Sequence, residues 1–260
     1  TFDFGTYIFT NQLSVILFTL YFILIWCIIY YEEVFLGGRI LRKFNYVCSF
    51  LLVITLSVFI ITAGQNISAR TSGTYLYYFN DTRAVNNLGT EYTSSQMADE
   101  IAGFMNSWRP DEFQVYENTG YDMQGIFSAR DSGNMLRVKT ALDISLVICL
   151  VSLIITVSIY VYFLKNDFKL VLRKRLKASW AVTAAMLIIE GFLLMSEKGV
   201  GWLASFIGLE SLSDNSLLSA ILGGDFVNMA GFFVMAYTFA VAAALSYLTY
   251  VLTKPPRIFY

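Results

Sequence analysis

Five apolar stretches divide this chain, and each approaches or exceeds the length that a helix needs to cross a lipid bilayer. A hydrocarbon core about 30 Å thick requires about 20 apolar residues in a helix. Inside lipid only helices and closed barrels satisfy their own backbone polar groups. The sequence therefore predicts an all-α integral membrane protein with about five transmembrane helices. The stretches cover residues 7–31, 47–62, 140–164, 180–196 and 230–252.

Composition supports this class. Of the 260 residues, 57% are hydrophobic and only 14% are charged, and the mean hydropathy is +0.59. Soluble domains carry about 25% charged residues. The formal net charge of −1 argues against a nucleic-acid-binding surface, so we expect no nucleic-acid partner.

Basic residues predict the orientation. The connector before residue 47, residues 165–177 and the tail after residue 252 together hold 11 of the 18 Lys and Arg residues. Lys and Arg in short loops favour the cytoplasmic side of a membrane. We therefore expect a multi-pass plasma-membrane protein with a cytoplasmic C-terminus. The N-terminus, residues 64–139 and residues 197–229 then face outside.

Residues 64–139 are too long and too polar for a simple connection. Thr93 and Gln96 have the spacing of a helix capping box. An apolar helical face ending before Pro110 follows them, which predicts a small α+β extracytoplasmic cap packed on the membrane helices. The face comprises Met97, Ile101, Phe104, Met105 and Trp108.

Two other segments complete the outer side. Residues 74–79 are β-branched and aromatic, which fits either a strand or a row of tyrosines at the lipid headgroups. Residues 197–229 alternate apolar and acidic side chains, so we expect an amphipathic segment in the outer interface.

Ser128 and Asp131 predict a second helix start, one that continues without a break into the third apolar stretch. Polar side chains crowd the first turns of this helix. One interpretation is a ligand-binding site at the membrane surface, and the other is a set of headgroup anchors. The candidate ligand-binding residues are Arg130, Asn134, Arg137 and Lys139.

Two carboxylates fall within apolar stretches and are the candidate catalytic residues. Counting from Trp180 places Glu190 roughly 15 Å deep, where an ionised carboxylate is costly. Glu190 is either a buried acid, base or headgroup ligand, or a polar group that joins two helices. Asp143 lies about one turn inside the third stretch and can pair with Arg137 or Lys139.

Histidine is absent from the chain, and each of the three cysteines lies within an apolar stretch. Buried cysteines of this kind behave as small hydrophobic residues. Histidine is the commonest metal ligand and the usual proton-transfer group near neutral pH. The sequence therefore predicts no disulfide, no metal site and no cofactor.

Four short motifs follow one another between the second and third apolar stretches. They are YYFN at 77–80, TSSQM at 93–97, FSARD at 127–131 and NMLRVK at 134–139. With the apolar stretches around them, over residues 45–252, they resemble the lipoprotein intramolecular transacylase family of Gram-positive bacterial membranes. The resemblance implies a four-helix membrane bundle with an extracytoplasmic cap. It also implies transfer of an acyl chain from the diacylglyceryl group of a lipoprotein to the amino group of the same N-terminal cysteine, which makes the lyso form.

The resemblance breaks at the residues that carry this chemistry. The family pattern has a histidine where this chain has Asn134, and a second histidine is expected around residues 205–211, which hold none. An amide does not take up a proton near neutral pH. Residues 1–45, an extra apolar helix with a basic connector, have no counterpart in the four-helix pattern, which residues 46–260 match.

The sequence therefore predicts a non-catalytic relative of a lipoprotein transacylase. Its expected partners are membrane lipids, and lipoproteins or other membrane-protein subunits. It either binds a lipid or lipopeptide or serves as a subunit or scaffold of a membrane complex. One alternative is an acyltransferase that uses Glu190 or Asp143 as its base, with Asn134 holding the carbonyl oxygen. A further alternative is a component of a transporter.

Overall fold

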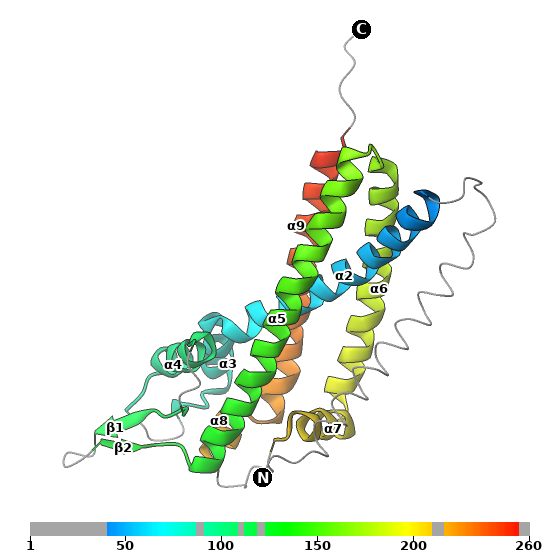
Figure 1. The fold of residues 1–260 in the computed structure, drawn as a ribbon. Coiled ribbons are helices and arrows are strands. Elements are labelled where there is room, and N and C mark those ends of the chain that lie inside the picture. The colour runs from blue at the N-terminus through cyan, green and yellow to red at the C-terminus, as the bar shows by residue number, and fades with distance from the viewer. Residues whose placement is uncertain (1–40, 87–90, 109–111, 119–122, 210–215, 255–260) are drawn as a thin grey trace, which may run out of the picture.

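The computed structural model describes all residues except 1–40, 87–90, 109–111, 119–122, 210–215 and 255–260 (Figure 1). Four long helices dominate: α2 (Leu41–Arg70), α5 (Ala129–Lys165), α6 (Lys169–Met195) and α9 (Gly224–Thr253). Each contains a stretch long and apolar enough to cross a membrane. The chain is thus an all-α, multi-pass membrane protein. The first predicted span, 7–31, lies outside the described residues.

Helix α2 is the central helix of this bundle and contacts α5, α6 and α9. Its most apolar stretch is 61% buried, against 17%, 22% and 28% for the other three. In Figure 1, α2 runs obliquely across the other helices. Its approach to α9 depends on Gly64, where a Cβ atom would overlap the side-chain hydroxyl of Thr238 and contact its backbone. Small residues of this kind allow the backbones of membrane helices to come close.

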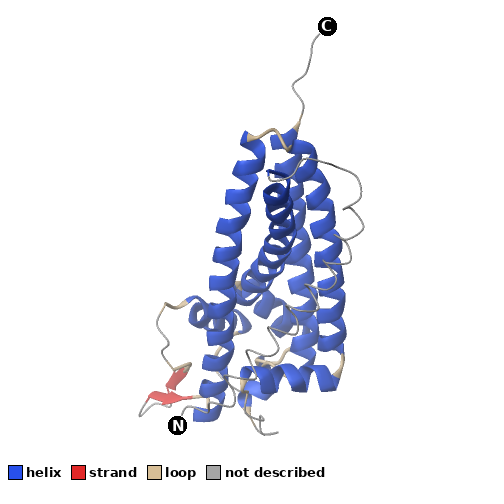
Figure 2. Cartoon of the chain, turned by 45° about the vertical axis from the view of Figure 1, so that its right-hand side comes forward, coloured by secondary structure: helices blue, strands red, loops and turns tan. Residues whose placement is uncertain are grey.

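The cap lies at one end of the bundle, where α2 and α6 end and α5 and α9 begin (Figures 1 and 2). At the opposite end α6 begins at Lys169, directly after a short loop from α5. The prediction of a basic connector over 165–177 is therefore wrong. Lys and Arg are good helix formers, and hydropathy marks only the apolar part of a helix. Most of these basic residues form the first turns of α6.

Residues 71–128 form the cap, which is α+β as predicted. It contains α3 (Ser72–Thr82), α4 (Ser94–Asn106) and the antiparallel strands β1 (Tyr116–Asn118) and β2 (Met123–Gly125). The core of the cap consists mainly of aromatic, methionine and aliphatic side chains. Met135 of α5 and the short helix α8 (Leu217–Ile221) pack against it. The buried cap residues include Tyr75, Tyr78, Phe79, Met97, Ile101, Met105, Phe113 and Phe127.

The prediction of a strand or a tyrosine row over residues 74–79 is wrong, because these residues form α3. Tyr75, Tyr78 and Phe79 have helical spacing and are buried, whereas Tyr77 is exposed. The rings of Tyr75 and Tyr78 lie 5.6 and 5.3 Å from that of Phe226 on α9. Burial against a neighbouring helix thus overrides the β-propensity of the aromatic residues.

The capping box that starts α4 is confirmed. Thr93 Oγ1 accepts a hydrogen bond from the Gln96 backbone N–H at 3.3 Å, and Gln96 Oε1 accepts one from the Thr93 N–H at 2.9 Å. The predicted apolar face is buried except at its end. Trp108 is 98% exposed, because α4 ends at Asn106 and Trp108 leaves the helical face.

Residues 197–229 do not form one continuous amphipathic element. The structure has α7 (Glu197–Ile207), which ends at Gly208 with a φ of 75°, and then α8. Glycine adopts this left-handed conformation without steric cost. Helix α9 begins at Gly224, earlier than the predicted residue 230.

Candidate functional site

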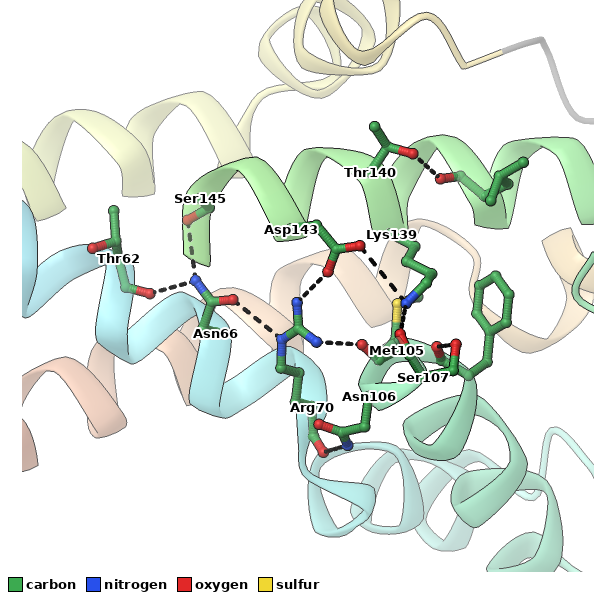
Figure 3. Close-up of polar contacts among 12 residues, drawn as sticks. Thr62, Asn66, Arg70, Met105, Asn106, Ser107, Lys139, Thr140, Asp143 and Ser145 are labelled. Atoms are coloured by element: carbon green, nitrogen blue, oxygen red, sulfur yellow. Dashed lines mark hydrogen bonds and ion pairs between the residues drawn. The ribbon is translucent and has the colours of Figure 1, made fainter. Parts of the chain in front are cut away.

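Arg70, the last residue of α2, connects the bundle to the cap. Its Nη2 lies 2.6 Å from Asp143 Oδ1 on α5, and its Nη1 donates to the carbonyl of Met105 on α4 (Figure 3). Its Nε donates to Asn66 Oδ1 at 3.2 Å, and its own carbonyl accepts a hydrogen bond from Asn106 Nδ2 at 2.8 Å. One side chain thus fixes α2, α4 and α5 relative to one another.

Lys139 joins the same group from one turn earlier on α5. Its ammonium is only 2% exposed, donates to the carbonyl of Ser107 and lies 3.7 Å from Asp143 Oδ2. The ring centroid of Phe104 lies 5.6 Å from the ammonium nitrogen. A buried ammonium is costly unless it is paired. Here a carboxylate, a carbonyl and an aromatic face replace its water.

Asn66, Arg70, Lys139, Asp143 and Ser145 form what we call the junction. Asn66 Nδ2 completes it by donating to Ser145 Oγ at 3.2 Å. The junction holds two cations and one carboxylate, so its formal charge is +1. The Asp143 side chain is 48% exposed and is the open edge of this group. The other charged members are largely enclosed by protein.

The other predicted ligand-binding residues lie nearer the start of α5, outside the junction. Asn134 is buried, and Arg130 is exposed. Arg137 Nη1 donates to the carbonyl of Gly208 at 2.5 Å and so fastens the end of α7 to α5. The structure therefore brings Lys139 and Asp143 together and leaves Asn134, Arg137 and Arg130 apart from them.

The predicted helix start at Ser128 is confirmed, with a different partner for the carboxylate. Ser128 Oγ accepts a hydrogen bond from the Asp131 N–H at 3.2 Å. The Asp131 carboxylate is buried and accepts a hydrogen bond from Ser216 Oγ at 2.5 Å. Ser216 caps α8, so this bond fixes α8 on the start of α5.

Glu190 lies on the other side of α2. Its Oε1 accepts a hydrogen bond from Gln65 Nε2 at 3.0 Å. Consecutive helical residues point about 100° apart, so Gln65 faces α6 while Asn66 faces α5. The prediction that Glu190 lies roughly 15 Å deep counts from Trp180, whereas α6 begins at Lys169. Because α6 runs from Lys169 to Met195, Glu190 lies about 7.5 Å from its cap end.

Tyr75 lies beside the junction on the cap side. Its phenol donates to the Ala69 carbonyl at 2.7 Å. Burial raises the pKa of this phenol above its ordinary value of about 10, and the nearby Arg70 guanidinium offsets part of the rise. The phenol therefore remains a neutral hydrogen-bond donor at physiological pH.

Arg70 and Asn66 are absent from the sequence-based predictions, although a signal for them exists. Thr62, Asn66 and Arg70 recur every four residues and so form one polar edge of a helix. The predicted span ends at Thr62 because hydropathy falls there, whereas α2 continues to Arg70. A polar row that extends a transmembrane helix beyond its apolar part is the pattern to look for.

The junction holds α2, α4 and α5 together, and its half-exposed carboxylate is available to bind a polar group of a ligand. Both oxygens of Asp143 face cations, Oδ1 towards Arg70 and Oδ2 towards Lys139. Neither oxygen is directed at a nucleophilic side chain by these contacts. Within the part of the chain that the structure describes, no group of His, Cys, Asp and Glu side chains is placed to hold a metal ion.

The fold is similar to that of solved structures of the membrane integral lipoprotein intramolecular transacylase Lit from Bacillus cereus. One such structure has a TM-score of 0.63 and 11% identity, and the match covers 82% of this chain and 97% of that one. The structure of a histidine-to-arginine variant gives a TM-score of 0.65 at 11% identity, and the match covers 82% of this chain and 93% of that one. The structure of a histidine-to-alanine variant gives a TM-score of 0.64 at 13% identity, and the match covers 82% of this chain and 95% of that one. No protein-family model and no curated protein matches the sequence. At this identity the similarity shows a shared fold.

Proposed function

We propose that this protein is a non-catalytic relative of the lipoprotein intramolecular transacylases that binds a lipid or a lipidated peptide beside the cap. The observation that carries the proposal is a transacylase-like fold in a chain that contains no histidine. In the sequence resemblance Asn134 stands where the family pattern has a histidine, and its amide does not accept a proton near neutral pH. The scaffold is thus retained without the proton-transfer groups.

The acyltransferase alternative would need a carboxylate as the base. Asp143 is engaged by two cations, and Glu190 binds an amide on the opposite side of α2. General-base catalysis requires the base to reach the proton that it removes, alongside an activated nucleophile. Because the two carboxylates lie on different sides of α2, they do not form a joint acid–base pair. This separation favours binding over catalysis.

The open edge of the junction supports a lipid-like ligand. Asp143 is half-exposed, and Ile144 and Val147 on the following turn of α5 are exposed apolar residues. A hydrogen-bonding headgroup placed at Asp143 would therefore have apolar helix surface for its acyl chains directly alongside. This combination of polar and apolar surface suits an amphiphile.

The proposal includes an orientation in a bacterial plasma membrane. The end of the bundle opposite the cap holds most of the basic residues of 165–177, and Lys254. The positive-inside rule then favours a cytoplasmic location for that end and an outer location for the cap. The apolar stretch at 7–31, which lies outside the described residues, is predicted from the sequence alone. Its length and composition support a second candidate role, as the contact of a membrane-complex subunit.

The test is purification of the full chain in a mild detergent, followed by native mass spectrometry of everything that remains bound. We expect a retained lipid or lipopeptide that is reduced in the Asp143→Ala variant. The control is Asp99→Ala, which removes an exposed carboxylate from α4. Both variants must elute as monodisperse protein.

Absence of any bound lipid or lipopeptide would contradict the binding role. Stoichiometric co-purification of another membrane protein in its place would favour the subunit role. Equal losses in Asp143→Ala and Asp99→Ala would remove the junction from the binding site.

A further inference from the structure

The end of the bundle opposite the cap contains a guanidinium that two helices hold in place. Arg173 of α6 donates from Nε to Thr253 Oγ1 at 2.7 Å and from Nη2 to the Thr253 carbonyl at 2.9 Å, at the end of α9. Its Cζ lies 5.8 Å from the ring centroid of Tyr250. A guanidinium fixed in this way is preorganised, so binding through it costs little side-chain entropy.

Three exposed cations accompany Arg173. Lys174 and Lys177 follow it on α6, and Lys254 follows the end of α9. Arg173 and Lys177 are four residues apart, so these like charges face each other on one side of the helix. The only acidic residue of α6 is Glu190, near its other end. No carboxylate on α6 lies within one turn of Arg173 and Lys177 to neutralise their charge. An anion that binds from outside the protein would neutralise it.

Apolar surface adjoins the same cations. On the last turns of α9 the side chains of Tyr247, Tyr250, Val251 and Leu252 are all exposed. Tyrosine is enriched where a membrane protein crosses from lipid into headgroups. An occupant of this place therefore meets positive charge at one end and an apolar, aromatic helix surface at the other. A soluble phosphate would use only the first of these features.

We propose that Arg173, Lys174, Lys177 and Lys254 bind the headgroup of an acidic phospholipid whose acyl chains lie along the end of α9. Thr253 accepts from Nε and from one N–H of Nη2, so the second N–H of Nη2 and the two of Nη1 supply the hydrogen bonds that phosphate oxygens accept. The three lysines supply the net positive charge that distinguishes an acidic lipid from a zwitterionic one. This site lies at the far end of the bundle from the junction and does not depend on the proposed function.

The experiment measures lipid binding to the full-length chain by native mass spectrometry in a mild detergent. Dioleoylphosphatidylglycerol and dioleoylphosphatidylcholine are titrated separately. We expect the wild-type protein to prefer phosphatidylglycerol. Each of Lys174→Ala and Lys177→Ala should weaken that binding about fivefold. Phosphatidylcholine binding should not change.

Two further variants control for folding and for general charge. Arg173→Lys keeps the charge and should weaken binding less than Arg173→Ala, provided both proteins elute as wild type does. Lys198→Ala removes an exposed cation from α7 at the cap end and should leave phosphatidylglycerol binding unchanged. Because Lys174 and Lys177 are exposed, their variants test the proposal even where Arg173→Ala does not fold.

Three results would overturn the proposal. The first is equal affinity for the two lipids. The second is a loss in Lys198→Ala as large as that in Lys177→Ala. The third is displacement of phosphatidylglycerol by inorganic phosphate at equal concentration, which would indicate a site for a soluble anion and not for a lipid.

Discussion

The junction and the interior of the bundle are held together by different chemistry. At the junction the guanidinium of Arg70 binds a carboxylate, a carbonyl and an amide from three elements. Near the middle of the bundle, hydroxyl groups make hydrogen bonds between the helices. Ser57 Oγ donates to the Ser179 carbonyl at 3.1 Å, and Thr156 Oγ1 donates to Thr55 Oγ1 at 3.1 Å.

The difference follows from where each region lies along the helices. Charged groups are costly in hydrocarbon, and small hydroxyls that return a hydrogen bond to their own helix are not. Asp143 is half-exposed near the start of the apolar part of α5, so its charge is partly compensated by solvent or headgroups. Charged contacts at the junction therefore add to the apolar packing that holds the cap on the bundle. The middle of the bundle relies on apolar packing and neutral hydrogen bonds.

Arg70→Met should have the largest effect, because it removes the donor for Asp143, Met105 and Asn66 at once. We expect a loss of about 3 kcal/mol in the free energy of unfolding, since each buried acceptor left without a donor costs about 1–3 kcal/mol. The loss of the donor to Asp143 costs less, because that side chain is half-exposed. Equilibrium unfolding in mixed detergent measures this. Lys198→Met, an exposed cation on α7, is the control. Similar losses in the two variants would mean that the junction contributes no specific stability.

Gly64→Ala tests the neutral packing. The added methyl group meets the Thr238 backbone as well as its hydroxyl, so α2 and α9 must separate. We expect a loss of about 2 kcal/mol, typical of overpacking. Gly191→Ala on α6 is the matched control because a Cβ atom there would meet no other atom within 4 Å, and it should leave stability unchanged or improve it slightly. Tolerance of Gly64→Ala would show that this packing is loose.

Ser57→Ala removes one neutral contact between α2 and α6. The expected loss is about 0.6 kcal/mol, the average for a hydrogen bond between membrane helices. Ser158→Ala is the control, because its exposed hydroxyl bonds only to the Ile154 carbonyl of its own helix. The same unfolding titration compares the two. A loss above about 3 kcal/mol for Ser57→Ala would place the bundle interior on a par with the charged junction.

Glu190→Gln should have the smallest effect. Its side-chain carbonyl still accepts the hydrogen bond of Gln65, so stability should change by less than about 0.5 kcal/mol. Lipid retention should not change either. Asp143→Asn, in contrast, leaves Arg70 and Lys139 without their shared carboxylate and should cost more. A loss of lipid retention confined to Glu190→Gln would restore the catalytic interpretation of that residue.

The membrane class, the cap and both helix starts at Thr93 and Ser128 could be predicted because each rests on a local pattern. Hydropathy over a span and side-chain–backbone capping need no knowledge of the tertiary fold. The prediction of a strand over 74–79 was wrong because burial of Tyr75 and Tyr78 against Phe226 favours a helix there. Phe226 lies far away in the sequence, so no local pattern indicates this contact.

The junction was only half predictable for the same reason. Lys139 and Asp143 lie one turn apart on one helix, so their pairing follows from spacing. Arg70 reaches Asp143 across 73 residues, and no local pattern reports such a contact. The predicted depth of Glu190 counts from Trp180, because hydropathy does not detect that α6 begins earlier, in a basic segment.

We propose that this transacylase-like fold carries no transacylase activity. The direct test is incubation of the purified wild-type protein with a diacylglyceryl lipopeptide, followed by tandem mass spectrometry. Transfer within one molecule leaves the total mass unchanged, so fragmentation must locate each acyl chain. We expect a bound lipopeptide with both acyl chains still on the glyceryl group. An acyl chain on the cysteine amino group, formed by wild type but not by Asp143→Ala or Glu190→Gln, would contradict it.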